Sequence, residues 1–273
     1  MNNYIQISFP LSLPEDSDIL VAILSELGFE GFEETEASLR AYIREDTFRE
    51  DEVREICANN SFSYHKKIIP GQNWNESWEQ HFQPVTINDF CGIRASFHES
   101  LKNVQHEIII TPKMSFGTGH HDTTRLMIEN MAQIDFVGKI VLDFGTGTGV
   151  LAILAEQLGA KQIIAIDQDD WSIQNAEENI RANHCSNITV KKLSGLDFEG
   201  SFDIVLGNIN KNVIISNLRF LSQHLRKEGV VLLSGLLSDD FGEIQSVLTT
   251  HHFSISYCSQ SNQWICLTCF LAI

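Results

Sequence analysis

The sequence has 273 residues, which exceeds one ordinary domain and favours a catalytic domain with a smaller companion. With 43% hydrophobic and 20% charged residues the chain can bury a full core, and its net charge of -17 argues against a large nucleic-acid footprint while suiting a basic partner. It has no apolar run of membrane-spanning length and no signal-peptide layout at its start, so a cytoplasmic protein is expected.

The first 69 residues show the pattern of a small α+β domain. Hydrophobic periodicity and turn residues predict the order β-α-β-β-α-β, which is a ferredoxin-like unit. The predicted elements are strand 5–9, helix 19–27, the paired strands 29–34 and 38–43, helix 48–58 and strand 61–69. Residues 1–60 contain fourteen Asp or Glu and four Arg, an acidity that fits either a solvated face or a docking surface.

A short linker is predicted next. Pro70-Gly71 interrupts the chain, and Trp74, Trp78 and Phe82 then recur at helical spacing within 73–82. This aromatic stripe predicts a connecting helix that packs on the following domain. The expected organisation is therefore a substrate-docking domain over 1–69, a linker helix over 70–84 and a catalytic domain over 85–273.

From residue 85 the pattern alternates between strands and helices, which indicates a parallel sheet covered on both faces. Its strongest signal is the segment 139–154, KIVLDFGTGTGVLAIL, in which an apolar strand leads through Asp143, Gly145, Gly147 and Gly149 into a helix. Glycines in such a turn let the backbone approach a ligand at a helix N-terminus. A second apolar strand ends in Asp167, whose carboxylate can accept hydrogen bonds from the ribose hydroxyls of an adenosine.

A nicotinamide site must be weighed as well, because Gly147, Gly149 and Ala152 satisfy a G-x-G-x-x-A pattern. Asp143 argues against it, since an acid at the strand end repels a pyrophosphate and suits a ligand with an ammonium and a sulfonium. The chain also ends in two consecutive strands, 253–259 and 263–271, without a helix between them. Such a terminal hairpin is typical of methyltransferase sheets, so S-adenosylmethionine is the predicted cofactor.

The six cysteines are scattered, which favours reduced thiols. Cys266 and Cys269 form a C-x-x-C within the last strand, where a three-residue offset sends them to opposite faces. Because no second pair completes a zinc site, they are predicted to be structural, and no metal is expected.

Several further segments resemble the PrmA family, whose members methylate large-subunit ribosomal protein eleven. They are the linker NWNESWEQHFQP, the segment TPKMSFGTGHHDTTRLMIE at 111–129, VLGNI at 205–209, LLSGLL at 232–237 and Trp264 near the end. The FGTG-x-H-x-TT stretch is the most diagnostic, and the resemblance covers nearly the whole chain. It implies a class I methyltransferase domain, with a Rossmann-like, mostly parallel seven-stranded sheet and a C-terminal antiparallel hairpin.

The resemblance also implies functional residues. It assigns cofactor contacts to Thr124, Gly145, Asp167 and Asn208, and it makes the glycine-rich stretch Phe116, Gly117, Thr118 and Gly119 a flap over the site. Asp143, Gly147 and Gly149 belong to the same cofactor loop. Thr124 lies near the start of a helix with Asp122 as the expected N-cap, and His120 and His121 are expected to be loop residues.

Asn208 has a second expected role. In related amine methyltransferases a polar residue at this strand end accepts a hydrogen bond from the target nitrogen, so Asn208 is the candidate for aligning the amine. The sequence departs from the family at the glycine loop, at Asp122, and at Asn210-Lys211, where small apolar residues are usual. The last departure touches the acceptor side.

The predicted function is therefore methyl transfer from S-adenosylmethionine to lysine side-chain or N-terminal amines of ribosomal protein eleven, by a monomer. Three alternatives stay open. An RNA methyltransferase would need a basic face, which isolated pairs such as Lys66-Lys67 do not supply. A small-molecule methyltransferase would not need the first domain, and a non-catalytic cofactor sensor would not need intact site residues.

Overall fold

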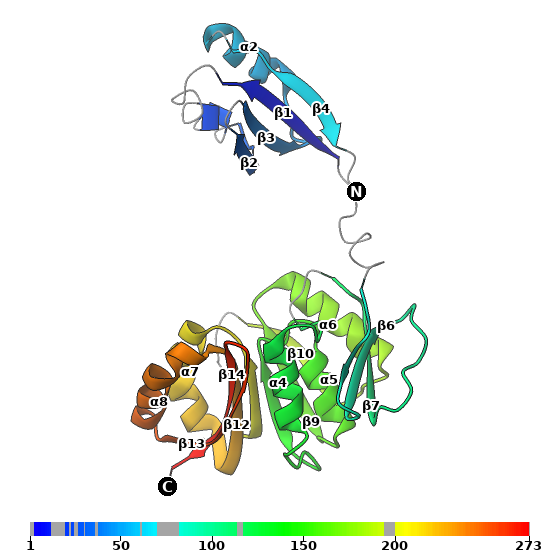
Figure 1. Ribbon diagram of the computed structural model, residues 1–273, viewed down its shortest axis with the longest axis vertical. Helices are drawn as coiled ribbons and strands as arrows, with labels where there is room; N and C mark the ends of the chain where they lie inside the picture. The colour runs from blue at the N-terminus through cyan, green and yellow to red at the C-terminus, as the bar shows by residue number, and fades with distance from the viewer. Residues whose placement is uncertain are drawn as a thin grey trace. The chain divides into compact units, whose positions relative to one another are not determined.

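The chain divides into two units, Met1–Trp78 and Glu79–Ile273, which are treated one at a time. The computed structural model describes residues 3–11, 20–21, 23–24, 27–29, 31–35, 38–60, 62–69, 82–113, 117–193 and 200–272 (Figure 1). The linker helix predicted over 70–84 lies outside the described residues except for 82–84, which are not helical. Phe82 is buried in the second unit.

The first unit is a four-stranded antiparallel sheet in the order β2-β3-β1-β4. The strands are β1 (Tyr4–Pro10), β2 (Gly31–Thr35), β3 (Ser38–Arg44) and β4 (His65–Ile69), and helix α2 covers Glu50–Asn60. Ile5, Ile7 and Phe9 alternate along β1 into a core that Leu20 and Leu24 of the first helical segment also enter. This strand order is that of the ferredoxin-like unit, which confirms the prediction for this part of the chain.

The second unit is built on a seven-stranded sheet in the order β10-β9-β8-β11-β12-β14-β13. The strands are β8 (Ile140–Phe144), β9 (Gln162–Asp167), β10 (Ile188–Lys192), β11 (Phe202–Asn208), β12 (Leu225–Leu237), β13 (Phe253–Ser261) and β14 (Trp264–Leu271). All neighbouring pairs are parallel except those that β14 forms with β12 and β13. The predicted class I methyltransferase sheet with its terminal hairpin is confirmed.

Helices cover both faces of this sheet (Figure 1). On one face α4 (Asp122–Met131), α5 (Val150–Gln157) and α6 (Asp170–Ala182) contribute to one core cluster, and on the other α7 (Lys211–His224) and α8 (Phe241–Thr250) contribute to a second. A short helix, η1 (Ser238–Asp240), precedes α8. As predicted, Cys266 and Cys269 enter opposite clusters.

A small second sheet packs outside the first helical layer. It has the order β5-β6-β7, formed by Val85–Ile87, Cys91–Ala95 and His106–Ile110, and it contacts α4, α5 and α6. β6 and β7 are parallel although only the loop 96–105 joins them. The alternation expected from residue 85 did not predict this sheet, because a parallel pair ordinarily needs a helical crossover.

Strand order places the site. The chain leaves β8 toward β9 and β10 on one side and later leaves β11 toward β12 on the other, so the order reverses between β8 and β11. In open α/β sheets ligands bind outside the carboxyl ends of the strands at such a reversal. None of the helices within the described ranges has the length and apolar character that a membrane crossing requires.

Candidate active site

A cavity of about 420 Å³ opens at the carboxyl ends of β8, β9 and β11. Its volume lies in the range of roughly 300 to 1,000 Å³ that small-molecule and cofactor sites occupy. It is lined by Phe144, Gly145, Gly147, Ile166, Asp167, Gln168, Ser172, Leu193, Asn208, Ile209, Asn210, Val213, Ser216 and Asn217. The cavity thus brings together Gly145, Gly147, Asp167 and Asn208, four of the residues that the sequence predicts for the site.

The glycine loop is a tight turn that is hydrogen-bonded to the end of β9. Gly145, Gly147 and Gly149 have φ values of 76°, 54° and 81°, which residues with a Cβ rarely adopt. The amides of Gly145 and Thr146 both donate to the carbonyl of Ile166 at 2.9 Å. Gly149 is the N-cap of α5 and supplies no side-chain cap, and the amide of Ala152 in the first turn of that helix is directed to the buried Asp143 carboxyl.

Asp167 connects the end of β9 to this loop. Its Oδ2 accepts the Gly147 amide at 2.9 Å, and its Oδ1 accepts the Asp169 amide at 3.2 Å. Asp169 in turn caps α6, and the hydrogen bond from the Ser172 amide lowers the pKa of its carboxyl. Asp167 therefore lines the cavity as a carboxylate whose orientation is set by two backbone groups, with acceptor capacity left for hydroxyls.

Asp143 lies behind the loop and does not line the cavity. Its side chain is 1% exposed, its Oδ2 accepts the Thr146 hydroxyl at 2.6 Å, and its Oδ1 has no hydrogen-bond partner. Burial raises the pKa of this carboxyl to about 7, with the nearby Asp167 charge adding to the rise. The Asp143 carboxyl was expected to face a cationic ligand, but it is buried behind the residues that line the cavity.

Thr124 and Asn208 meet although 84 residues separate them. The Asn208 Nδ2 donates to the Thr124 Oγ1 at 3.3 Å, and both side chains are buried. Asn208 is the last residue of β11, and its Oδ1 has no hydrogen-bond partner. A buried amide oxygen without a partner is costly, so its position beside the cavity marks a place where a ligand N–H or O–H can bind.

The start of α4 corrects one prediction. The N-cap is His121, whose Nδ1 accepts the Thr123 amide at 3.3 Å, and Asp122 is the first helical residue. The Asp122 carboxylate instead accepts hydrogen bonds from Ser261 Oγ at 3.1 Å and Asn262 Nδ2 at 2.8 Å in the β13–β14 turn. The Asp122 carboxylate does not cap the helix because these residues of the turn bind it instead.

The flap stretch is described from Gly117 onward, and Phe116 lies outside the described residues. The Gly117 carbonyl accepts the Thr148 hydroxyl at 2.7 Å, which joins this stretch to the glycine loop. Gly117 and Gly119 are buried with φ values of 104° and 89°. These two glycines and Thr118 are not among the residues that line the cavity.

The two histidines beside the flap have packing partners. The His120 ring packs edge-on against the Phe82 ring with 4.9 Å between the ring centroids, and the His121 and Trp264 ring centroids are also 4.9 Å apart. Within the described ranges, no three His, Cys, Asp or Glu side chains are grouped closely enough to hold a metal ion.

Part of the cavity wall escaped sequence analysis. Asn210 caps α7 by accepting the Val213 amide at 3.1 Å, and Val213, Ser216 and Asn217 recur on one side of that helix. An asparagine N-cap followed by residues at i, i+3 and i+4 can be recognised in the sequence, so this wall of the cavity could have been predicted. Lys211, which departs from the family pattern, donates to Asp240 at 2.7 Å and Glu243 at 2.8 Å and does not line the cavity.

Comparisons with known proteins agree with this architecture. A profile of the family described as ribosomal protein L11 methyltransferase (PrmA) matches residues 15–270. A protein of that name from Phocaeicola vulgatus is 36% identical over 256 residues, covering 91% of each chain. One from Porphyromonas gingivalis is 38% identical over 265 residues, covering 94% of this chain and 91% of the other.

A solved structure is similar too. The crystal structure of a ribosomal protein L11 methylase from Lactobacillus delbrueckii subsp. bulgaricus has a TM-score of 0.66 and 29% identity, covering 70% of this chain and all of that one. The fold and the family imply S-adenosylmethionine as the methyl donor. The cavity volume, the Asp167 carboxylate and the unpartnered Asn208 Oδ1 fit such a ligand. The chain belongs to the ribosomal protein L11 methyltransferase (PrmA) family.

Proposed function

We propose that this protein transfers methyl groups from S-adenosylmethionine to amines of ribosomal protein L11, namely lysine side chains or the N-terminal amine. The observation that carries the proposal is the Asn208–Thr124 pair, which leaves the buried Asn208 Oδ1 without a partner beside the cavity. Family membership supports the substrate, because the relatives described above carry its name.

The residues have separate tasks in this proposal. When bound, S-adenosylmethionine supplies a methyl group on a sulfonium, an electrophile that a neutral amine can attack. Asp167 and the glycine loop hold the nucleoside end, and Thr124 fixes the rotamer of Asn208 by accepting its Nδ2 hydrogen bond. The Asn208 Oδ1 is then available to accept an N–H of the incoming amine and to direct its lone pair. Such positioning can contribute roughly 7 to 11 kcal/mol.

Proton removal from the acceptor needs no dedicated base. A lysine with a pKa of about 10.4 needs about 4.6 kcal/mol to present its neutral form at pH 7, at 1.36 kcal/mol per unit. Transfer into a partly desolvated site next to a cationic sulfonium lowers that cost. No histidine lines the cavity among the described residues, and none is assigned a catalytic role.

The two parts of the chain are proposed to divide recognition from catalysis. Residues 1–69 would dock the substrate, 70–84 would form the linker and 85–273 would carry out the transfer. The acidity of residues 1–60 supports this division, because a lysine-rich ribosomal protein is an oppositely charged partner. We further propose that the protein acts as a monomer in the cytoplasm, where its substrate is made, without direct sequence-specific contact to nucleic acid.

The test is to incubate the protein with purified L11 and isotopically labelled S-adenosylmethionine. Mass spectrometry should show mass increases in multiples of one methyl group, mapped to lysine or N-terminal amines. A parallel reaction with ribosomal RNA and a small-molecule extract separates the alternatives. Label that enters RNA or small molecules and leaves L11 unmodified would contradict the proposal.

A further inference from the structure

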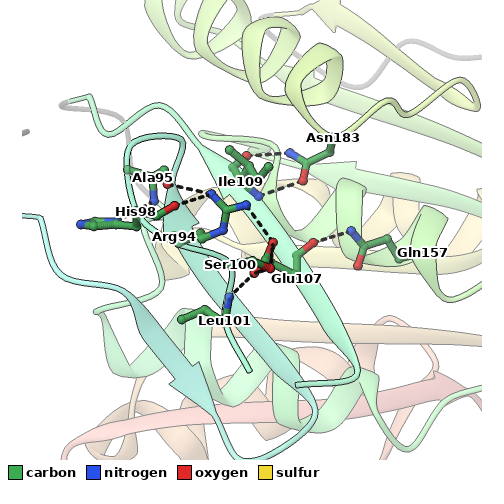
Figure 2. A network of polar contacts seen from close by, with 9 residues as sticks. All are labelled: Arg94, Ala95, His98, Ser100, Leu101, Glu107, Ile109, Gln157 and Asn183. Atoms are coloured by element: carbon green, nitrogen blue, oxygen red, sulfur yellow. Dashed lines mark hydrogen bonds and ion pairs between the residues drawn. The ribbon is translucent and has the colours of Figure 1, made fainter. Parts of the chain in front are cut away.

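Side-chain amides from α5, from α6 and from the C-cap of α6 bind the outer edge of β7. Gln157 Nε2 donates to the Glu107 carbonyl at 2.9 Å, and Asn183 both donates to the Ile109 carbonyl at 2.6 Å and accepts its amide at 2.8 Å (Figure 2). One residue pair further along, Asn179 Oδ1 accepts the Thr111 amide at 2.7 Å. These bonds replace a neighbouring strand, because β7 is an edge of its sheet.

Asn179 differs from the others in its second partner. Its Nδ2 donates at 2.8 Å to the carbonyl of Thr148, which lies between Gly147 and Gly149 in the cofactor loop. The Asn179 side chain and Thr148 are fully buried. One amide therefore binds both the strand that leads to the flap and the loop that faces the cavity.

A third hydrogen bond closes a ring. The Thr148 hydroxyl donates to the Gly117 carbonyl at 2.7 Å, and a Cβ at Gly117 would approach that hydroxyl to 2.7 Å. The ring runs from Thr111 through Asn179 and Thr148 to Gly117, which is six residues along the chain from Thr111. Both ends of the segment 111–117 are thus attached to the glycine loop by buried polar groups.

We propose that Asn179 is a positioning residue for cofactor binding, which holds the glycine loop and the segment entering α4 in one arrangement through Thr148 and Thr111. Because α4 carries Thr124, the ring also sets the distance between the glycine loop and the Asn208–Thr124 pair. The inference rests on the proposed function only in taking the glycine loop as the S-adenosylmethionine site.

A purely structural role makes a different prediction. If Asn179 only capped the edge of β7, its loss would act as the loss of Asn183 does, since both side chains bind neighbouring backbone, Asn179 through two hydrogen bonds and Asn183 through three, one of them to the Asn179 carbonyl. Asn183 has no bond to the glycine loop and is the matched control. Both variants should lower the melting temperature, and only the positioning role predicts a difference in cofactor affinity.

The experiment compares Asn179→Leu with Asn183→Leu in the full chain by calorimetry with S-adenosylmethionine and with its demethylated product. We expect Asn179→Leu to weaken binding about tenfold or more, which is ~1.4 kcal/mol, and Asn183→Leu to leave affinity near the wild-type value. Equal affinities in the two variants would overturn the proposal. A wild-type protein that does not bind either compound would instead overturn the proposed function.

A second pair of variants tests the ring if Asn179→Leu does not fold. Thr148→Val removes the hydroxyl donor to Gly117 at nearly constant shape, whereas Thr148→Ser keeps it. We expect the valine variant to lose affinity and the serine variant to retain it. Where Asn179→Leu does fold, its double variant with Thr148→Val should lose less affinity than the sum of the two single losses. Wild-type affinity in Thr148→Val, or equal losses in both Thr148 variants, would overturn the ring.

Discussion

Asn208 carries two hydrogen-bonding groups with different surroundings, a donor engaged by Thr124 and a buried acceptor without a partner. If the acceptor aligns the amine, its contact matters most in the transition state. Asn208→Ala should then reduce turnover roughly tenfold or more, with a smaller effect on cofactor affinity. Steady-state kinetics with L11 and calorimetry measure the two effects. Asn217→Ala, at another cavity asparagine, is the control, and full turnover in Asn208→Ala would refute the role.

Asp167 combines a proposed ligand contact with support of the loop, because it accepts the Gly147 amide. Asp167→Ala removes both, and we expect the dissociation constant of S-adenosylmethionine to rise by roughly tenfold or more. Asp167→Asn keeps the size and one acceptor oxygen, so it should lose less. Calorimetry with NAD in parallel tests whether the cavity is an S-adenosylmethionine site. Stoichiometric binding of NAD without a response to S-adenosylmethionine would contradict that assignment.

Asp143 should make stability depend on pH. Its pKa is about 7 in the folded chain, above the ordinary 3.8, so the folded state holds the extra proton between these values. Stability therefore falls as pH rises through this window, by at most ~1.4 kcal/mol per pH unit. Asp143→Asn removes the titration. Urea unfolding at pH 5, 6 and 7 should show the wild type losing stability relative to the variant, and parallel curves would refute the shift.

At the scale of elements, the first turn of α4 is attached to the C-terminal hairpin. Asp122 accepts hydrogen bonds from Ser261 and Asn262, and the Asn262 bond is the main reason that the pKa of Asp122 is lowered. Asp122→Ala should lower the melting temperature and speed amide exchange in the β13–β14 turn. Glu129→Ala, which breaks an exposed ion pair on the same helix, is the control. Unchanged exchange in the turn would show that the attachment has no effect.

At the scale of the whole molecule, each unit has a hydrophobic core of its own. A variant that begins at Gln72 keeps Phe82 and both cores of the second unit. It should bind S-adenosylmethionine with wild-type affinity and lose most activity on L11, because the proposed docking domain is absent. Calorimetry and a methylation time course measure the two properties. An unchanged rate on L11 would refute the docking role.

Much of this molecule could be read from local patterns. Strand–glycine–helix sequences such as 139–154 identify an element and its ligand end at once, because backbone conformation and hydrophobic period are encoded in neighbouring residues. The same holds for the terminal hairpin and for Asp167 at the end of β9. The N-cap of α4 was predicted wrongly, since Asp122 has distant partners in the β13–β14 turn that no local pattern reveals.

The sequence alone indicated the class I methyltransferase fold, the ferredoxin-like order of elements along the first unit and the resemblance to the PrmA family. Only the tertiary structure showed that Thr124 touches Asn208, that Asp143 is buried behind the loop, and that Asn179 joins Thr111 to Thr148. The physical reason is range. Periodicity and turn chemistry act over a few residues, whereas the contacts of Asn179 and Asn208 join residues that are 31 to 84 positions apart and that only the tertiary fold brings together.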